Sequence, residues 1–401
     1  MIVLLRRNLN LGLVILVAAV ILGVSFGMGA AALGAIAVKS ATSPDTLDLI
    51  SALVLIAFLE HAMRRAGLMQ RMVGALHALI SDRRIIMAAL PAFLGLLPSA
   101  GGARFSAPLV HQVTANLEIP PERKAFINYW YRHIWECVMP IYPSIIVAGQ
   151  VLDLRLDRLI IGMVPMVPIT IAAGIIPAFK GMTRKGTISS EGTAAGTPDM
   201  AAGKVSCVFD ALAALSPVIA VVVGVTILKL NISAAVAAVL IVMMIVGRYS
   251  LRDAWSLVRE AFSRNVVALV LGVMLFRDIL VASGALNQIS TFLSVTGIPP
   301  MFLLFILPFL VAFSTGLGVT VPSIAFPLIM GILITAGSVN LSYVTFAFVS
   351  GFVGTMLSPA HLCLVLTVDY FKASFAKVQN SLWAPAIAVE LAALVLASLK
   401  G

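Results

Sequence analysis

Long apolar segments recur along almost the whole chain, and they constrain its fold more than any other feature of the sequence. A helix needs about 20 apolar residues to cross the hydrocarbon core of a bilayer. Apolar residues make up 61% of the chain and charged residues 11%, far from the balance of a soluble domain. We expect an all-α polytopic membrane protein with about nine spanning helices, at 11–38, 47–64, 127–150, 158–180, 207–228, 231–247, 264–281, 341–367 and 382–399.

Two further apolar stretches, 85–117 and 299–336, are each interrupted near the middle by small and polar residues. The interruptions read PSAGG at 98–102 and STGLG at 314–318. Non-helical backbone at membrane depth is tolerated only where it is buried in protein or lines a cavity. We therefore predict two re-entrant hairpins, each made of two short helices that meet at a polar tip.

Two of the spans carry residues that interrupt a helix. The span 127–150 contains Pro140 and Pro143, and the span 341–367 contains Gly354 and Pro359. A proline inside a helix removes a hydrogen bond and frees backbone groups for other partners. The sequence thus predicts two broken helices.

The chain reads as two similar halves, 1–180 and 207–401, joined by a cytoplasmic linker at 181–206 that is rich in Gly, Thr and Ala. Each half has one hairpin followed by one broken helix. Equivalent positions carry the same residue: Asn10 and Asn231; Gly67 and Gly284, and Pro91 and Pro308, at a shift of 217; Pro108 and Pro327, and Pro140 and Pro359, at a shift of 219. Five crossings separate the first span from its counterpart, so the repeats are inverted, as in many secondary transporters.

The distribution of lysine and arginine gives the orientation. With the N-terminus inside and the C-terminus outside, nineteen basic residues fall on cytoplasmic segments. Five fall outside, namely Lys39, Arg155, Arg158, Lys229 and Lys400. This bias follows the positive-inside rule. It places the first hairpin on the cytoplasmic side and the second on the outer side.

Several function classes are disfavoured. The net charge is +10, but the basic residues lie in short loops and form no aromatic-interleaved stripe, so we expect no nucleic acid partner. The three cysteines have no paired spacing and read as small core residues. No P-loop, HExxH or GxGxxG motif is present, so we expect no enzyme, no ATP-driven pump, no cofactor and no metal-ligand cluster.

The two hairpin tips are the predicted binding site. Tips that enter from opposite faces meet near the midplane, where helix N-termini favour anions and unwound carbonyls favour small cations such as sodium. The alternative is that the glycines only allow close helix packing. The candidate residues at the tips are Ser99, Gly101, Gly102 and Ser106 in the first hairpin, and Ser314, Thr315, Gly316, Gly318, Thr320 and Ser323 in the second.

Ionisable residues add candidates near these tips. Arg104 lies just past the first tip, and a charge at that depth suits recognition of a carboxylate; alternatively it extends to the cytoplasmic surface or forms a structural pair. His133, Glu136 and His361 are candidates for carrying a proton. Arg132, four residues before Glu136, also allows a purely structural ion pair along the helix.

Three segments, LLPSAGGARFSAPLV, NYWYRHIWECVMPIYP and SPAHLCLVLTVDYF, resemble an uncharacterised family of prokaryotic permease-like membrane proteins. That family is grouped with the ion transporter superfamily of citrate and dicarboxylate transporters, gluconate and lactate permeases and sodium/proton antiporters. The resemblance implies the cell inner membrane of a prokaryote, a homodimer, and a transport domain that slides like an elevator against a scaffold. It also implies that the breaks, with Thr355 and Ser358, complete the binding site.

The sequence departs from that superfamily in lacking a Ser-Asn-Thr tip motif, which weakens the case for sodium coupling, and in lacking a counterpart of 207–228 before residue 11. The leading hypothesis is a secondary active transporter of a small anionic solute, a carboxylate, coupled to protons or sodium. A cation/proton antiporter is the main alternative. An intramembrane enzyme and a channel are the remaining ones.

Overall fold

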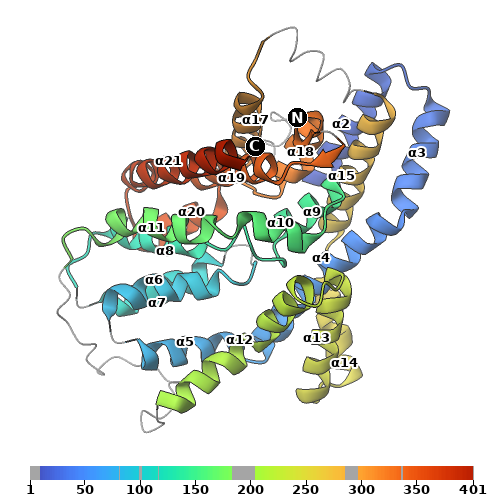
Figure 1. The fold of residues 1–401 in the computed structure, drawn as a ribbon. Coiled ribbons are helices and arrows are strands. Elements are labelled where there is room, and N and C mark those ends of the chain that lie inside the picture. The colour runs from blue at the N-terminus through green and yellow to red at the C-terminus, as the bar shows by residue number, and fades with distance from the viewer. Residues whose placement is uncertain are drawn as a thin grey trace.

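The computed structural model describes residues 10–80, 82–98, 102–115, 117–182, 204–284, 297–335 and 337–400, without the side chains of Arg104, Lys204, Val205, Leu251, Thr335 and Lys400. These residues are almost entirely helical (Figure 1). The first half contains α2 Leu11–Ser25, α3 Ala30–Thr42, α4 Pro44–Arg65, α5 Leu68–Leu79, α6 Arg83–Leu94, α7 Ala103–Val113, α8 Pro121–Arg132, α9 Pro143–Leu152, α10 Leu156–Met163 and α11 Met166–Phe179.

The second half begins with α12 Lys204–Thr226. Two short strands pair as an antiparallel ladder between the hairpin and the broken helix. The elements are α13 Ile232–Val246, α14 Leu251–Ala261, α15 Arg264–Ala282, α17 Pro300–Thr315, the π-helical turn η1 Val321–Ala325, α18 Phe326–Leu333, β1 Ile334–Thr335, β2 Ser338–Val339, α19 Leu341–Leu357, α20 Leu362–Phe371 and α21 Phe375–Lys400.

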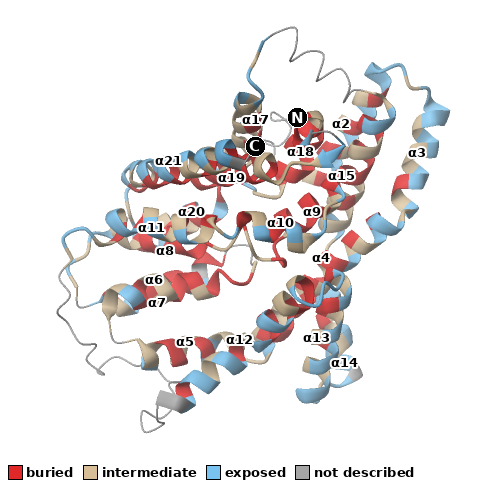
Figure 2. Ribbon diagram, in the orientation of Figure 1, coloured by how far each residue is buried: buried red, intermediate tan, exposed pale blue. Residues whose placement is uncertain are grey.

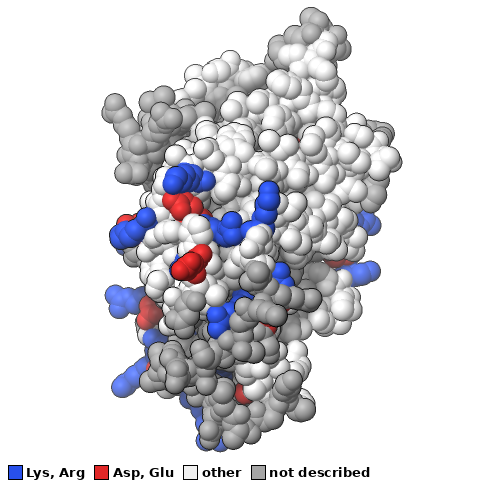
Figure 3. Space-filling model, turned by 90° about the vertical axis from the view of Figure 1, so that its left-hand side faces the viewer, with Lys and Arg blue, Asp and Glu red and all other residues white. Residues whose placement is uncertain are grey.

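The prediction of an all-α membrane protein is confirmed. Among the described residues, six helical segments are long and apolar enough to span a bilayer: Pro44–Arg65, Leu156–Phe179, Ser206–Thr226, Arg264–Ala282, Leu341–Phe371 and Phe375–Leu399. Large apolar side chains also cover much of the outer surface, including Ile176, Ile245 and Leu399. Figure 3 shows a broad region of one face without charged side chains, which suits contact with lipid.

Three of the nine predicted spans are not among these six segments. The segment 11–38 is two helices, α2 and α3, because Gly27 between them has φ +75°, which a right-handed helix does not allow. The segment 127–150 is divided between α8 and α9, and 231–247 forms the 15-residue α13. The predicted span 382–399 is longer, since α21 begins at Phe375.

Each of the two predicted hairpins is a pair of helices joined by a short connection. In the first, α6 and α7 pack together and the chain between them runs from 95 to 102. In the second, α17 packs on η1 and α18. Ser99 and Gly101 of the first tip lie outside the described residues.

Both predicted broken helices are broken. The chain between α8 and α9 is non-helical from 133 to 142, and the chain between α19 and α20 is non-helical from 358 to 361. The first break therefore starts directly after Arg132, before either Pro140 or Pro143. Asp153 ends α9 with φ 50° and Lys372 ends α20 with φ 51°, so both broken helices finish on a left-handed residue 219 positions apart.

The two halves pack reciprocally. Helix α2 lies against α15, and α13 lies against α4. The Asn10 side chain caps α2 and donates to Oδ1 of Asn265 at 2.6 Å, while Asn231 caps α13 and donates to Oδ2 of Asp48 at 2.9 Å. Each cap thus connects one half to the other. Capping satisfies the free N–H groups at a helix start.

The helices that carry the breaks form a stack beside the two reciprocal helix pairs, α2 with α15 and α4 with α13. Figure 1 shows α21, α11, α8, α6 and α5 one above another, in agreement with the packing of α11 on α21 and α8, and of α6 on α8. The largest buried side chains are in α8, where Phe126 stacks on Trp130 at 5.8 Å between ring centroids. Figure 2 shows many buried residues in α8, α9 and α19. The breaks are therefore at the centre of the molecule.

Candidate functional site

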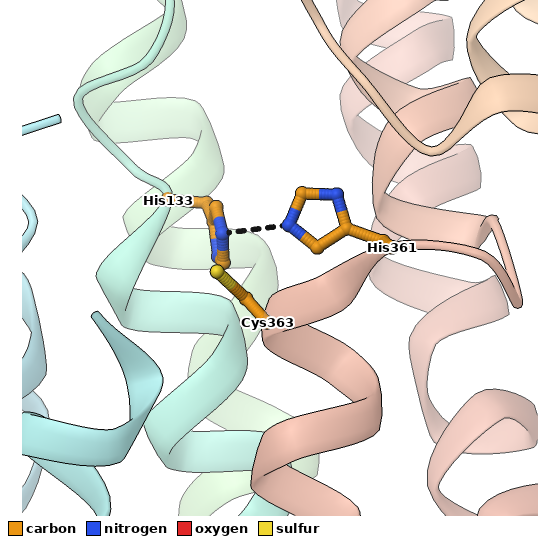
Figure 4. A group of neighbouring side chains, drawn as sticks. All are labelled: His133, His361 and Cys363. Carbon is orange, nitrogen blue, oxygen red and sulfur yellow. Dashed lines mark hydrogen bonds between the residues drawn. The ribbon is translucent and has the colours of Figure 1, made fainter. Parts of the chain in front are cut away.

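The two helix breaks meet at a pair of histidines. His133 is the first residue after α8, and His361 is the last residue before α20. Their Nε2 atoms lie 3.2 Å apart, and the rings are steeply inclined to each other, at 78° (Figure 4). Both side chains are almost fully buried, with exposed fractions of 3% and 8%. Two residues separated by 228 positions are thus in direct contact.

Backbone carbonyls orient both rings. His133 Nδ1 lies 2.6 Å from the carbonyl oxygen of Tyr129, and His361 Nδ1 lies 2.9 Å from the carbonyl oxygen of Gly316. A carbonyl oxygen can only accept a hydrogen bond, so each Nδ1 carries the hydrogen and donates it. The tautomer of each neutral ring therefore has a lone pair on Nε2, which points at the other ring.

Cys363 completes this group. Its Sγ and the nearest ring nitrogens of His133 and His361 all lie within 4.8 Å of one another, and Figure 4 shows the sulfur beside the His133 ring. The backbone of Ala103, at the start of α7, and the Arg132 guanidinium both lie close to this sulfur. The group therefore joins the first hairpin to both broken helices. Among the described residues, no other set of this kind is found.

Tyr129 holds the histidines from one side. Its ring centroid is 4.8 Å from that of His133 and 5.6 Å from that of His361. Its hydroxyl donates to the carbonyl oxygen of Met356 at 3.1 Å, in the last turn of α19. Since this residue is fully buried, it fixes α8 against the end of α19.

The second hairpin tip packs against the second break. Gly316 ends α17 with φ +68°, and a Cβ there would lie 2.6–2.8 Å from the backbone of Ala360 and His361. The Ser358 hydroxyl donates to the carbonyl oxygen of Phe313 at 2.6 Å. Gly318 faces Thr355, whose Oγ1 is 3.9 Å from the position of an added Cβ. The sequence prediction that these tip and break residues lie together is therefore supported by the geometry.

The first hairpin meets the first break in the same way. Gly95, which follows α6, lies directly against the carbonyl group of Arg132. The Tyr142 hydroxyl donates to the Gly95 carbonyl at 2.6 Å, and the Trp135 indole donates to the Ala92 carbonyl at 2.9 Å. Both donors belong to the break. In each half, the first hairpin helix thus ends on a glycine that touches the break of its own half.

The remaining predicted site residues do not belong to the group of His133, His361 and Cys363. The Thr315 and Thr320 hydroxyls are 2.9 Å apart, and Thr320 also donates to the Leu317 carbonyl at 2.6 Å. Gly102 is buried, and Ser314 is half-buried in α17. Three hydroxyls bond to carbonyls three or four residues earlier in the chain, at 3.5, 2.7 and 3.1 Å: those of Ser106, Ser323 and Thr355.

The predicted helical ion pair between Arg132 and Glu136 does not have the expected geometry. Arg132 is the last residue of α8, and Glu136 lies in the non-helical break, so they are not four residues apart on one helix. Glu136 is also not part of the group of His133, His361 and Cys363. The i,i+4 argument is wrong here because the helix ends earlier than predicted.

Two polar residues in the interior, one buried and one half-buried, were missed from the sequence. Cys363 was interpreted as a core residue, although its position two residues after His361 is a signal that it shares the same turn. Glu390 lies in α21, and its Oε1 accepts from the Ser350 hydroxyl at 2.6 Å while Oε2 has no partner among the described residues. A carboxyl group inside the span 382–399 was the signal for it.

A pocket of about 910 Å³, measured with its open mouth, lies elsewhere, at the ends of α4, α9 and α13. Several of its polar side chains bond to one another or to backbone carbonyls. The Arg155 guanidinium contacts Asp157 at 3.0 Å, and the Gln150 amide donates to the Asp45 carbonyl at 3.0 Å. We therefore place the candidate site at the helix breaks.

These observations define an integral membrane protein of helical hairpins and paired broken helices whose breaks meet in the interior. The chain belongs to the family described as "Protein of unknown function (DUF401)", whose model matches residues 1–399. No curated protein matches the chain.

Proposed function

We propose that this protein is a secondary active transporter of a small anionic solute, a carboxylate. The observation that supports this most is the contact of the two helix breaks through His133 and His361. Buried non-helical backbone is expensive in a membrane, and transporters use discontinuous helices to build their substrate sites near the midplane. The breaks here are buried, polar and derived from both halves of the chain.

Inverted repeats are part of this proposal. The matched caps of Asn10 and Asn231, each bonded to the other half, support an internal two-fold relation. So do the matched left-handed residues Asp153 and Lys372. With oppositely oriented repeats, the two hairpins enter from opposite sides of the membrane. Such a plan fits membership of the ion transporter superfamily.

Positive electrostatics at the breaks support an anionic substrate. The buried side chain of Arg132 lies directly before the first break. Helix α7 begins at Ala103 and α20 begins at Leu362, and both N-termini approach Cys363. Helix N-termini carry a partial positive charge and favour anions.

Alternating access of the elevator type fits the division of the packing. The reciprocal pairs α2–α15 and α4–α13 form a frame, while the hairpins and broken helices mainly contact one another. In this proposal the second group moves as one body and the frame forms the contact with a second copy of the chain.

The driving force is a proton or sodium gradient. Glu390 supports protons, because it is an acidic side chain within a spanning helix, and among the described residues it bonds to Ser350 alone. Intramembrane carboxyl groups of this kind commonly form part of ion pathways.

Uptake by proteoliposomes tests the function. Purified protein is reconstituted, radiolabelled mono-, di- and tricarboxylates are supplied, and a proton or a sodium gradient is imposed. We expect uptake of at least one carboxylate, and its loss in Arg132→Gln. Arg248→Gln, on the residue that ends the turn after α13, is the control that retains uptake. Ion flux without competition by any carboxylate would instead identify a cation/proton antiporter, and no flux under either gradient would overturn the proposal.

A further inference from the structure

We propose that His133, His361 and Cys363 form a binding site for a Zn²⁺-type transition-metal ion at the junction of the two halves. The inference goes beyond solute transport, and nothing in the sequence motifs indicates it. It depends on the identity, orientation and spacing of three side chains.

The first argument is the arrangement of lone pairs. Both Nδ1 atoms donate to carbonyl oxygens, so both neutral rings direct an unshared pair on Nε2 toward the other. At 3.2 Å these pairs repel each other unless a positive species lies between them. A buried contact of two acceptors therefore requires a cation.

The second argument is distance. In a tetrahedral zinc site with Zn–N bonds of about 2.0 Å, two ligating nitrogens are about 3.3 Å apart. The observed Nε2–Nε2 distance of 3.2 Å is close to this value without any movement. The Cys363 sulfur lies within 4.8 Å of both nitrogens, and a shift of about 1 Å brings it to the N–S separation of such a site.

The third argument is the surroundings of the ligands. Metal-bound histidines nearly always donate their second N–H to a carbonyl or carboxylate, which fixes the ring and raises its basicity. Tyr129 and Gly316 already provide these carbonyls. The Arg132 guanidinium lies close to the sulfur, and its positive charge offsets part of the cost of burying a thiolate ligand there.

Ligand chemistry identifies the class of ion. Two imidazoles and a thiolate suit Zn²⁺ or Cu⁺ and disfavour Mg²⁺, Ca²⁺ and Na⁺, which prefer oxygen ligands. On binding Zn²⁺, Cys363 loses its proton to solvent, so one proton is released for each ion bound. Three protein ligands leave a fourth position for water.

Cobalt spectroscopy of the purified full-length protein tests the proposal. Co²⁺ replaces Zn²⁺ in such sites and reports a thiolate ligand through a sulfur-to-metal absorption band. We expect one Co²⁺ per chain, the sulfur band, and loss of both when Zn²⁺ is added. Cys363→Ser should abolish the band, and His133→Gln or His361→Gln should weaken binding by at least about 10–100-fold.

Cys207→Ser is the matched control, because Cys207 is also a buried free cysteine but lies in α12. It should bind Co²⁺ like the unaltered protein, and circular dichroism melts should show that every variant is folded. A wild-type protein that takes up no Co²⁺ would overturn the proposal. A band that persists in Cys363→Ser would do the same. Neither result depends on transport.

Discussion

The carbonyl group of Gly316 accepts the hydrogen bond that orients His361, at 2.9 Å from Nδ1. The same glycine has φ +68°, and its Cα faces the backbone of Ala360 and His361 so closely that no Cβ fits. A single residue thus determines both the end of α17 and the position of one histidine.

Gly316→Ala should therefore be more damaging than an ordinary substitution of a left-handed glycine. The left-handed conformation costs a non-glycine residue about 1–2 kcal/mol, and the clash with the break adds to this cost. We expect loss of carboxylate uptake and a lower apparent melting temperature. Gly67→Ala is the control, because Gly67 has φ +67° but only the tip of Gln70 nearby, at 3.9 Å. Equal effects of the two substitutions would contradict the role of the close contact.

Tyr142→Phe should destabilise the protein by about 1–3 kcal/mol, because it leaves the Gly95 carbonyl without its donor. Thermal unfolding in detergent measures this change. Tyr131→Phe provides the comparison, since the Tyr131 hydroxyl is buried without a partner among the described residues. That substitution should be neutral or stabilising. A reversed order of the two melting temperatures would refute the assignment of these hydroxyls.

Glu390→Gln should remove the dependence of uptake on the proton gradient. The Ser350 hydroxyl lies 2.6 Å from Glu390 and 2.9 Å from the Phe346 carbonyl, so it can donate to an ionised carboxylate or accept from a protonated one. Glutamine retains the hydrogen bond but cannot exchange a proton. Uptake at several imposed pH gradients is the measurement. Glu260→Gln, on the exposed side of α14, should have no effect, and an unchanged gradient dependence in Glu390→Gln would exclude Glu390 as the proton carrier.

Asp82→Ala should destabilise the start of α6 by about 1 kcal/mol, because Asp82 Oδ1 accepts from the Arg84 N–H at 2.9 Å. This hydrogen bond, together with the Arg84 charge, holds the pKa of the Asp82 carboxyl below its ordinary value. A lowered pKa means that the charged cap stabilises the folded state above the unfolded pKa, about 3.9, and stops doing so as the pH falls through the folded value.

The measurement is the difference in melting temperature between the wild type and Asp82→Ala as a function of pH. It should be constant near neutral pH and shrink below about pH 4. Asp82→Asn, which retains a capping side chain, should remain close to the wild type. A difference that does not change with pH would show that the carboxylate charge is irrelevant.

Much of the architecture could be predicted because glycine and proline act locally. The tip and break residues of the second half, such as Gly316 and Pro359, mark the observed ends of α17 and α19. Likewise, Asn10 and Asn231 mark the observed starts of α2 and α13. Helix ends that depend on a nearby glycine, proline or capping asparagine could therefore be predicted from the sequence.

Other features depend on tertiary contacts. Helix α8 ends at Arg132, before either proline of that span, and the Arg132 carbonyl packs on Gly95 from another helix. The contact of His133 with His361 requires the relative placement of the two halves, which no local pattern contains. Cys363 looked like a core residue because its neighbours in space come from α7 and α8.

The reciprocal packing of α2 on α15 and of α13 on α4 has a consequence for biosynthesis. Gly12 and Gly272 allow the backbones of α2 and α15 to come into contact. The packing partner of α2 is therefore synthesised much later, since Asn10 and Asn265, which bond to each other, are 255 residues apart. During translation α2 is inserted into the bilayer without its packing partner until α15 has been synthesised. Interlocked in this manner, neither half is a self-sufficient folding unit, and fragments divided between α11 and α12 should accumulate only when both are produced together.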